Sequence, residues 1–447
     1  IASGIRPCQV VPEKMGVRHN AQGFDLNRDF VKLESPEVRA LVKALNDWKP
    51  EVFMDLHTTN GSKHRYTLTY DGPRNPAGDE RIVKSVRDVM LPAIEKKLMK
   101  HGFRSFFYGN FSRDRKQWVT YPSLPRYGIS YVGLRNRISI LSEAYSYATY
   151  KDRVLASRDF VRSCLDYFTE NQKTVQALLR SAEQSTIEAG RKPRADSKIH
   201  LRFRSAALKK PFTVLGFDGE KPKDFKLPFV GLCEPTLSVT RPYAYLFPPR
   251  AKVVENLQRH GIVAEELRED IELDLEVYRL DKIERSLREF QKHNLTLAEA
   301  SMRKVKRMVK AGTILVRTGQ PLGSLAGYLL EPQAQDGLLA WNFFDTDLKV
   351  GNDFIVARLP KPVPLNKGAV RPLRVGKIEK KPLTWEALRS RKIPSFRGIS
   401  PSVSWLDDGE HFYQRKEGKV YRVHARTGRV IKFLDPANLA VALMKLD

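Results

Sequence analysis

The sequence predicts an α/β domain over residues 1–180, a β-rich region over residues 198–372 and a short antiparallel meander over residues 375–447. Three observations predict this order. In the first part, apolar residues at helical spacing alternate with short apolar runs. From residue 198 the pattern changes to short alternating segments separated by turns. Near the end, Gly-containing turns recur about every ten residues, which is typical of connected antiparallel strands.

The first regular element is a helix that follows an irregular stretch over residues 1–30. Ser35 is suited to cap this helix, and Pro36 is suited to its first turn. Residues at helical spacing predict one apolar face, formed by Val38, Leu41, Val42, Leu45 and Trp48. A short apolar run over residues 52–54 then predicts a buried strand, which leads into Asp55-Leu56-His57-Thr58-Thr59-Asn60-Gly61.

Two more helices and one more strand complete this first domain. A helix is predicted over residues 79–100, with an inward face of Ile82, Val83, Val86, Val89 and Met90. A loop rich in aromatic and basic residues follows over residues 103–131. A strand over residues 137–141 runs into Ser142-Glu143-Ala144-Tyr145, and a long helix is predicted over residues 151–179. Helices that alternate with short strands are typical of an α/β domain.

The rest of the chain is predicted to hold a linker, the β-rich region and the meander. Residues 181–197 are polar and charged, as in a linker. Strands are predicted at residues 212–217 and 312–316, and the stretch 284–310 is left open between helix and strand. The last part predicts a short helix at residues 383–388 and strands at residues 403–405, 411–414 and 420–423. This is the pattern of a β-propeller blade, and the chain has room for one such blade at most.

The composition is that of a globular, strongly basic chain. Its 447 residues are 41% hydrophobic, and 78 Lys and Arg against 51 Asp and Glu give a net charge of +27. The basic residues are dispersed, and the sequence has no zinc-finger spacing, RNA-binding aromatic motif or arginine-rich tract, so no specific nucleic-acid partner is predicted. No apolar run is long enough to span a membrane.

Two residues at predicted strand ends carry side chains suited to catalysis. His57 follows a buried strand, where an imidazole can bind a metal while Asp55 orients the ring. The alternative is a histidine that only caps the strand. Glu143, at the end of another strand, can act as a general base beside a metal. The alternative is an ion pair with Arg137 or Arg153.

A third cluster, Asn27-Arg28, is suited to bind an anion. The guanidinium of Arg28 can bind a carboxylate through two parallel hydrogen bonds, and the amide of Asn27 adds another donor. The alternative is a surface ion pair between Arg28 and Asp25 or Asp29.

Taken together, these clusters resemble a known family. Gly-Phe-Asp-Leu-Asn-Arg-Asp-Phe at residues 23–30, Asp-Leu-His-Thr-Thr-Asn-Gly at residues 55–61 and Ile-Leu-Ser-Glu-Ala-Tyr at residues 140–145 follow in an order similar to that of the carboxypeptidase A-like zinc metallopeptidases. The resemblance covers roughly residues 1–170 and implies a carboxypeptidase-like mixed sheet with flanking helices. It also implies hydrolysis by zinc-activated water, with peptide or protein C-termini as substrates in the periplasm or outside the cell.

The resemblance implies a role for each matching residue. Asn27 and Arg28 match the pair that holds the C-terminal carboxylate of the substrate. His57 matches a zinc ligand, and Glu143 matches the catalytic general base. Arg18 matches the arginine that polarises the scissile carbonyl. Three residues are open as the mobile tyrosine of the family, namely Tyr121, Tyr127 and Tyr131.

The sequence departs from the family in its zinc ligands. The family takes two ligands from an H-x-x-E motif before the Asn-Arg pair, and none of the nine histidines here has a glutamate three residues later. One histidine does not build a three-ligand catalytic zinc site. The chain also begins with Ile1 rather than Met. We therefore expect a fragment that is inactive alone and holds only part of a site for one zinc ion.

Two later segments suggest further resemblances. Residues 397–409 look like the start of a dipeptidyl peptidase IV-type propeller, which the chain would hold in truncated form. Residues 320–342 resemble an accessory part of bacterial carboxypeptidases, which we expect to pack on the first domain or to restrict its substrates. Two alternatives stay open for the function: a non-catalytic chain that binds peptides or polyanions, and part of a dipeptidyl peptidase IV-type serine peptidase fusion.

Overall fold

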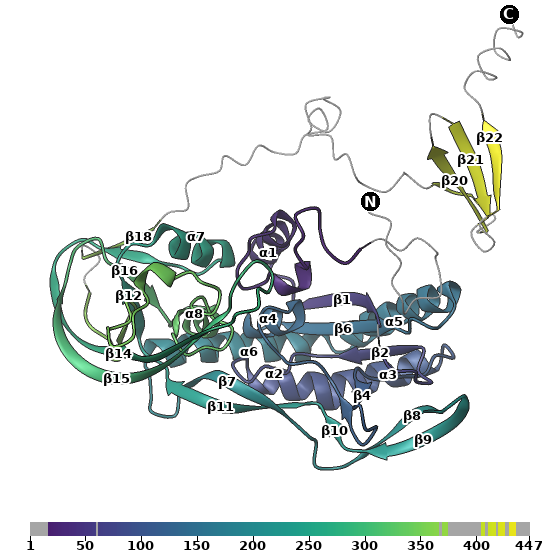
Figure 1. The fold of residues 1–447 in the computed structure, drawn as a ribbon, viewed down its shortest axis with the longest axis horizontal. Helices are drawn as coiled ribbons and strands as arrows, with labels where there is room; N and C mark the ends of the chain where they lie inside the picture. Colours follow the sequence, from purple (N-terminus) through teal and green to yellow (C-terminus); the bar gives the residue numbers. More distant parts are fainter. Residues whose placement is uncertain are drawn as a thin grey trace, which may run out of the picture. The chain divides into compact units, whose positions relative to one another are not determined.

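The structure is a computed structural model that describes residues 17–59, 61–365 and 369–373, and then residues 404–406, 410–416, 419–424 and 429–434. The described residues fall into two compact units, one within residues 17–373 and one within residues 404–434 (Figure 1). Each unit is described by itself. The first unit contains helices and several open sheets, and the described residues of the second unit form one sheet. The described residues form no closed barrel and no propeller.

A mixed four-stranded sheet forms the centre of the first domain. Its strand order is β1 (Val52–Thr58), β6 (Ile138–Ala144), β2 (Leu68–Asp71) and β3 (Ser105–Phe107). β1 and β6 are parallel, β2 and β6 are antiparallel, and β2 and β3 are parallel. The predicted mixture of helices and strands and both predicted strands are therefore confirmed, but the prediction that residues 52–54 are buried was wrong, because β1 lies at the edge of the sheet and is half-buried.

Helix α1 (Pro36–Trp48) begins as the sequence predicts. The Ser35 hydroxyl accepts a hydrogen bond from the Val38 backbone N–H at 3.3 Å. The buried face consists of Val38, Val42 and Leu45. The predicted face was too wide, because Trp48 is 86% exposed at the helix end and Leu41 lies at the edge of the buried stripe.

The helix predicted over residues 79–100 is present with an irregular middle. It consists of α2 (Glu80–Ser85), the π-helical turn η2 (Val86–Met90) and α3 (Leu91–Met99). In that turn the Leu91 N–H donates to the Val86 carbonyl, five residues back. The wider turn rotates the later side chains, so the prediction that Val89 faces inward was wrong, and its side chain is 58% exposed.

The predicted linker at residues 181–197 is largely helical. The helix predicted over residues 151–179 is divided in two by Asn171. Its first part is α5 (Tyr150–Glu170), and its second part belongs to α6 (Gln172–Arg191). α6 buries a narrow stripe of residues three or four positions apart, namely Val175, Leu179, Ala182, Thr186 and Gly190. Two of these five positions hold Thr and Gly, so the apolar pattern is weak and the polar outer face made the segment look like a linker.

The β-rich region contains the predicted strands. β7 (Lys198–Ala206) pairs with β11 (Leu232–Thr240), and β8 (Phe212–Asp218) forms a hairpin with β9 (Lys221–Leu227). Short strands β4 (Asn110–Phe111), β5 (Trp118–Val119) and β10 (Phe229–Val230) form a separate small sheet. The first domain and this region therefore share a sheet.

A seven-stranded sheet has the strand order β15-β14-β17-β12-β16-β13-β18. Its members are β12 (Ala244–Phe247), β13 (Glu265–Leu267), β14 (Ile271–Arg285), β15 (Thr296–Val309), β16 (Ile314–Arg317), β17 (Ala357–Leu359) and β18 (Val370–Pro372). The stretch 284–310, left open by the sequence, belongs mostly to the long β14–β15 hairpin. Helices α4 (Gly128–Leu134), α7 (Ala251–His260) and α8 (Gly323–Leu330) and the short turns η1 (Leu26–Arg28) and η3 (Asp345–Asp347) complete this unit.

The second unit is an antiparallel meander. Its strands are β19 (Ser404–Trp405), β20 (His411–Lys416), β21 (Lys419–His424) and β22 (Val430–Leu434), paired in chain order. The three predicted strands are present as β19, β20 and β21, and β22, which was not predicted, completes one four-stranded sheet. The helix predicted at residues 383–388 lies outside the described residues.

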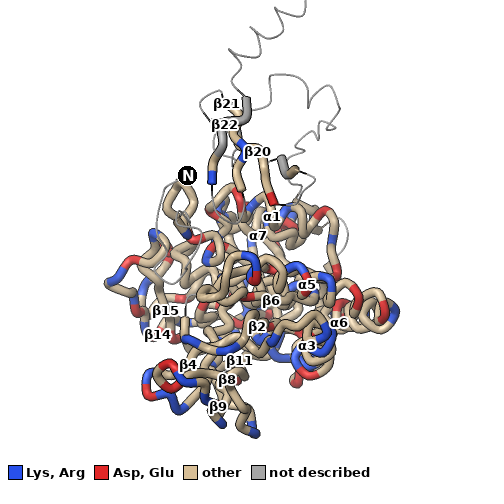
Figure 2. Tube along the Cα trace, turned by 90° about the vertical axis from the view of Figure 1, so that its right-hand side faces the viewer, with Lys and Arg blue, Asp and Glu red and all other residues tan. Residues whose placement is uncertain are grey.

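Charged residues are spread over the first unit. Figure 2 shows Lys and Arg interspersed with Asp and Glu along the trace. The described part of the chain has no helix with the length and apolar character that crossing a membrane requires.

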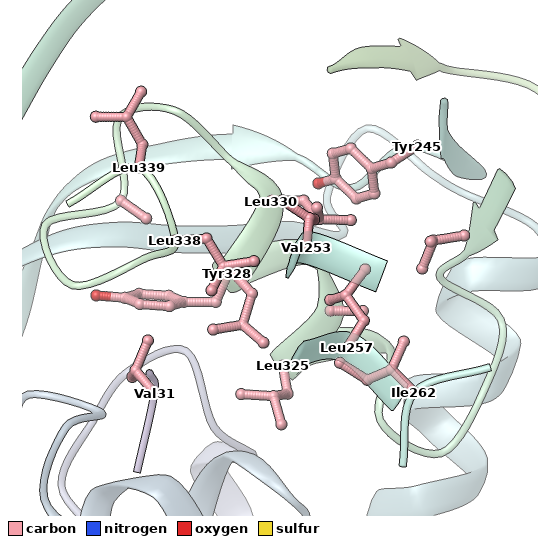
Figure 3. Packing of buried hydrophobic residues seen from close by; sticks show 14 of the residues in the cluster. Val31, Tyr245, Val253, Leu257, Ile262, Leu325, Tyr328, Leu330, Leu338 and Leu339 are labelled. Carbon is pink, nitrogen blue, oxygen red and sulfur yellow. The ribbon is translucent and has the colours of Figure 1, made fainter. Parts of the chain in front are cut away.

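One hydrophobic core joins the first domain to the β-rich region. Figure 3 shows Val31 of the first domain close to side chains from α7 and α8 and the segment that follows α8. The cluster also takes in Val38 and Val42 from α1 and Tyr131 from α4. The buried apolar area is therefore continuous from about residue 30 to residue 356.

Acid is expected to destabilise this core through His260. The ring is fully buried; its Nε2 donates to the Val31 carbonyl at 3.0 Å, and its Nδ1 accepts from the Tyr131 hydroxyl at 2.8 Å. Burial lowers the pKa of His260 from 6.5 to about 3. Between pH 6.5 and pH 3, His260 binds a proton in the unfolded chain but stays neutral in the folded chain. Stability is thus complete above pH 6.5 and is lost as pH falls toward 3, at up to about 1.4 kcal/mol per pH unit.

His260→Gln measures this contribution. Glutamine can keep one donor and one acceptor but does not titrate. Urea denaturation between pH 7 and pH 4 is expected to show that the free energy of unfolding depends less on pH in this variant than in wild type, by up to about 1.4 kcal/mol per pH unit. An unchanged slope for His260→Gln would contradict the assignment.

Candidate active site

The candidate site lies at the carboxyl ends of β1 and β6. Their parallel register pairs His57 directly with Glu143. Neighbours in such a ladder, and residues two positions apart, point to the same face of a sheet, so Asp55, His57 and Glu143 share one face. Helix α4 begins against this face at Gly128, where an added Cβ would lie 2.9 Å from the Phe30 ring and 3.5 Å from Asp55 Oδ2. Glycine thus lets the helix approach the site closely.

Glu143 is a buried carboxyl group with an unusual pKa. Its residue is 9% exposed. Burial raises the pKa of Glu143 to about 7, the charges of His57 and Arg18 oppose this rise, and the charge of Asp55 adds to it. Arg137, one suggested partner, instead pairs with Glu183 at 3.0 Å. A carboxyl group with a pKa near neutrality is suited to take and return a proton.

His57 lies against Asp55. The distance from His57 Nε2 to Asp55 Oδ1 is 2.8 Å. Burial works to lower the pKa of His57, but the contact with Asp55 and the charge of Glu143 outweigh it and raise the pKa. The Nε2 atom is buried, and the 2.8 Å contact does not have hydrogen-bond geometry, so this nitrogen has no hydrogen-bond partner among the described residues. An imidazole nitrogen that forms no hydrogen bond can coordinate a metal ion.

Arg28 ends the turn η1 and lies over an aromatic ring. Its guanidinium carbon is 4.4 Å from the ring centroid of Tyr127. The distance from Arg28 Nη1 to Asp25 Oδ2 is 3.9 Å, and the same nitrogen donates a hydrogen bond to the Asn27 carbonyl at 2.7 Å. Burial lowers the pKa of Arg28, although Tyr127 and Asp25 oppose it. The alternative suggested by the sequence, an ion pair between Arg28 and Asp25, is therefore long. The guanidinium keeps N–H donors for another anion.

Two hydrogen bonds hold the segment that carries Arg28. The Asn27 side-chain oxygen accepts from the Gly128 N–H at 2.9 Å, which ties η1 to the start of α4. The Asp25 N–H donates to the Gln291 side-chain oxygen at 2.8 Å, which ties it to the β14–β15 hairpin loop. Arg18 is a half-exposed side chain whose Nε donates to Asp25 Oδ2 at 2.5 Å. This pair keeps Arg18 near Glu143, whose pKa it lowers.

The three open tyrosines occupy different surroundings. The Tyr121 ring lies 5.5 Å from that of Tyr127, beside Arg28. Tyr131 lies apart from them, fully buried, with its hydroxyl bonded to His260 and Arg135.

A fourth tyrosine, Tyr108, was missed by the sequence. Its ring is 5.8 Å from that of Tyr121, and burial, with the charge of Glu143, raises the pKa of Tyr108 to about 12. Its position in the aromatic loop at residues 103–131 was the only signal.

An open cavity of about 740 Å³ adjoins β1. Its polar lining includes Arg18, Asn27, Asp55 and His57. Apolar side chains of α1 and α5 complete the wall, among them Leu41 and Val154. Asn27, Arg18 and His57 thus border one space, whereas Arg28 and Glu143 do not contribute to its lining.

The described residues do not by themselves fit a catalytic zinc ion. Such a site needs three protein ligands. His57 is the one histidine at the site, and the described part of the chain contains no group of three or more His, Cys, Asp or Glu side chains arranged to hold a metal. The Nε2 atom of His57 forms no hydrogen bond, so the imidazole is compatible with one ligand position if Nε2 turns away from Asp55 Oδ1, 2.8 Å from it.

Comparisons with known proteins give distant relatives. The chain is 22% identical over 361 residues to carboxypeptidase 2 of Trichophyton rubrum, which covers 76% of this chain and 66% of that protein. It is 23% identical over 338 residues to a probable carboxypeptidase 2 of Arthroderma benhamiae, which covers 71% and 63%. The match to carboxypeptidase 2 of Trichophyton equinum is 23% over 363 residues. The chain thus spans less than two thirds of the length of these relatives.

No protein-family model matches the chain, and no solved structure matches it significantly. The aligned 361 residues exceed the 180 residues of the predicted first domain, so the likeness extends into the β-rich region. The chain is therefore a distant relative of fungal proteins named carboxypeptidase 2.

Proposed function

We propose that this chain carries the catalytic residues of a carboxypeptidase, which hydrolyses peptides at their C-termini. The observation that carries the proposal is the parallel pairing of His57 with Glu143, next to a cavity bordered by Asn27 and Arg18. The names of the fungal relatives support the same reaction. Hydrolysis of this kind needs a base for water, a donor for the oxyanion and a cation for the terminal carboxylate.

Each side chain has a part in this proposal. Arg28 binds the terminal carboxylate through its free N–H groups, and Asn27 fixes the position of Arg28 by bonding to the start of α4. Glu143 takes a proton from the attacking water and passes it to the leaving amine. Arg18 stabilises the negative charge that develops on the scissile carbonyl oxygen. Tyr121 and Tyr127 line the place of the substrate's terminal residue.

The proposal includes zinc, with His57 as one ligand and the other protein ligands outside the described residues. Bound zinc would supply Lewis acidity and a water of lowered pKa. We also propose a location in the periplasm or outside the cell. Residues 397–409 are proposed to be the start of a β-propeller. The β-rich region is proposed to support the substrate site or to restrict which substrates enter it. The hydrogen bond from Asp25 to Gln291 is a contact through which it can do so.

The free carboxylate of the substrate gives the sharpest test. Arg28→Met is expected to lower kcat/KM for a blocked dipeptide by about 10²-fold, because a charge-assisted contact is lost. The variant should not change the slow turnover of the matching C-terminal amide, which has no carboxylate to bind. The assay is done on a longer protein that supplies the remaining zinc ligands, with zinc content measured in parallel.

Arg194→Met is the matched control, since this arginine lies on the surface in an exposed ion pair with Asp196. Equal losses on the acid and the amide would remove Arg28 from carboxylate binding. A protein that binds no zinc in any form and hydrolyses neither substrate would instead favour the non-catalytic alternative. In that case, steeply salt-dependent binding to heparin would identify a polyanion-binding chain.

A further inference from the structure

A second cavity, separate from the candidate active site, has a buried arginine without a counter-ion. The cavity has a volume of about 920 Å³ and lies between α2, the end of α6 and the β7–β11 pair. Arg241, in the turn between β11 and β12, contributes to its wall and is 7% exposed. No residue on its lining belongs to the lining of the first cavity.

The Arg241 guanidinium has one side-chain partner. Nη2 donates to the Ser324 hydroxyl, at the start of α8, at 2.9 Å. Nε and Nη1 are buried and have no hydrogen-bond partner among the described residues, and no carboxylate of the described chain forms an ion pair with Arg241. Burial accordingly lowers the pKa of Arg241, with only Tyr245 opposing it. A buried charge left uncompensated in this way is costly, so a bound anion would stabilise it.

The free donors retain the geometry of an oxyanion fork. A guanidinium has five N–H groups, and Ser324 uses one of the two on Nη2. The other N–H of Nη2 therefore remains, and it forms a two-donor edge with either Nε or Nη1. A further nitrogen is left for a third oxygen. This number of donors suits a phosphate group, which has three acceptor oxygens, better than a carboxylate, which has two.

The charge of the lining also favours a dianion. Seven Lys and Arg side chains line the cavity against three Asp and Glu. Each of these acids already has a basic partner: Asp79 pairs with Arg81, Glu80 with Lys84, and Glu234 with Arg204. Three of the seven basic side chains are likewise paired with acids, namely Arg74, Lys84 and Arg87. Lys209 and Lys210 are exposed lining residues without an ion pair within the described residues. A ligand bound at Arg241 thus meets further positive charge in the same cavity.

We propose that this cavity binds a phosphate group, either inorganic phosphate or the phosphate of a small ester, through Arg241 and Ser324. Lys209 and Lys210 add long-range attraction. The site is independent of peptide hydrolysis, and none of its residues is assigned to that reaction.

Binding of inorganic phosphate to the 447-residue chain tests the proposal. At about 10 mM and constant ionic strength, phosphate is expected to raise the Tm by a few degrees, while acetate does not. Arg241→Gln should weaken phosphate binding at least tenfold by calorimetry, and Arg194→Gln should leave it unchanged. Lys209→Gln/Lys210→Gln should weaken it several-fold and reduce its salt dependence. Glycerol phosphate is compared with inorganic phosphate, and tighter binding of the ester identifies an ester as the ligand.

Several results would overturn the proposal. The first is that phosphate does not raise the Tm of the wild-type protein, and the second is that acetate raises it as much as phosphate does. The third is that Arg241→Gln binds phosphate as tightly as wild type. A structural role for Arg241 would show itself in Arg241→Met, as a lower Tm in phosphate-free buffer. Our proposal expects an equal or higher Tm there, because the variant removes an uncompensated buried charge. If Arg241 variants do not fold, unchanged phosphate binding by the double lysine variant counts against the proposal.

Discussion

Glu143→Gln is expected to lower kcat for a blocked dipeptide by about 10²- to 10⁴-fold in a longer protein that supplies the remaining zinc ligands, with zinc content unchanged. The amide keeps the size of the side chain but does not accept a proton from water. Because Glu143 is paired with His57 in the β1–β6 ladder, an isosteric change leaves the strands in register. Steady-state kinetics and metal analysis on the same sample separate loss of chemistry from loss of metal.

The same variant has a second expected effect, on stability without metal. The pKa of Glu143 is about 7 in the folded chain against an ordinary value of 4.5. The folded chain therefore holds a proton between pH 4.5 and pH 7 that the unfolded chain has lost, and wild-type stability falls as pH rises through this window. Glu143→Gln removes that fall, so it should be more stable than wild type at pH 8, by at most about 3 kcal/mol, and similar to wild type at pH 4.5.

Glu183→Gln is the matched control, because Glu183 is a partly exposed carboxylate paired with Arg137. It should not change turnover. Wild-type-like turnover of Glu143→Gln would exclude Glu143 as the base.

Asp336→Ala is expected to lower the free energy of unfolding by about 3–5 kcal/mol. Asp336 is fully buried and accepts hydrogen bonds from the Arg126 backbone N–H at 2.7 Å, from Arg126 Nε at 2.8 Å and from Trp341 Nε1 at 2.9 Å. Removing the carboxylate leaves the Arg126 guanidinium buried against the rings of Trp341 and Phe290. An unpaired buried charge of this kind is among the most damaging defects in a core.

Urea denaturation measures the loss, and two variants interpret it. Asp196→Ala breaks the exposed pair with Arg194 and should cost at most about 0.5–1 kcal/mol. Arg126→Met combined with Asp336→Leu should recover much of the stability, because neither charge then remains buried. If Asp336→Ala costs no more than the surface control, the buried pair is not a link between the two regions. Since Arg126 precedes Tyr127, activity should fall with Asp336→Ala even at temperatures where the protein stays folded.

The sequence predicted elements whose signals are local. The Ser35 cap, the strands that end near His57 and Glu143, and the strands β19, β20 and β21 were all found from residues within a few positions of one another. The shape of α6 was missed, because Thr186 and Gly190 in its buried stripe look like solvent-facing residues. The π-helical turn at Val86–Met90 has no sequence signature and reversed the expected side of Val89.

The site was predicted only in part. The order of the motifs led to His57 and Glu143, but the direct pairing of their strands depends on a long-range register that no local pattern encodes. For the same reason the sequence could not choose among Tyr121, Tyr127 and Tyr131. Tyr131 is held away from the other two by its contacts with His260, which is 129 positions further along the chain, and with Arg135, which is on the next turn. Arg241 could not be found at all, since its lack of a partner is a property of the folded surroundings.

The hydrogen bond from Asp25 to Gln291 has a consequence for folding. It joins residues 266 positions apart, whereas the strands that carry His57 and Glu143 lie in the first third of the chain. Contacts of such long range form late, because the entropy of closing the intervening loop is lost before the contact returns any energy. The hydrogen bond to Gln291 is therefore expected to form after β1 and β6 have paired, whereas the bond between Gly128 and Asn27, within the first domain, can form earlier. Docking of the β14–β15 hairpin loop against the segment at Asp25 is thus expected to be a late step of folding.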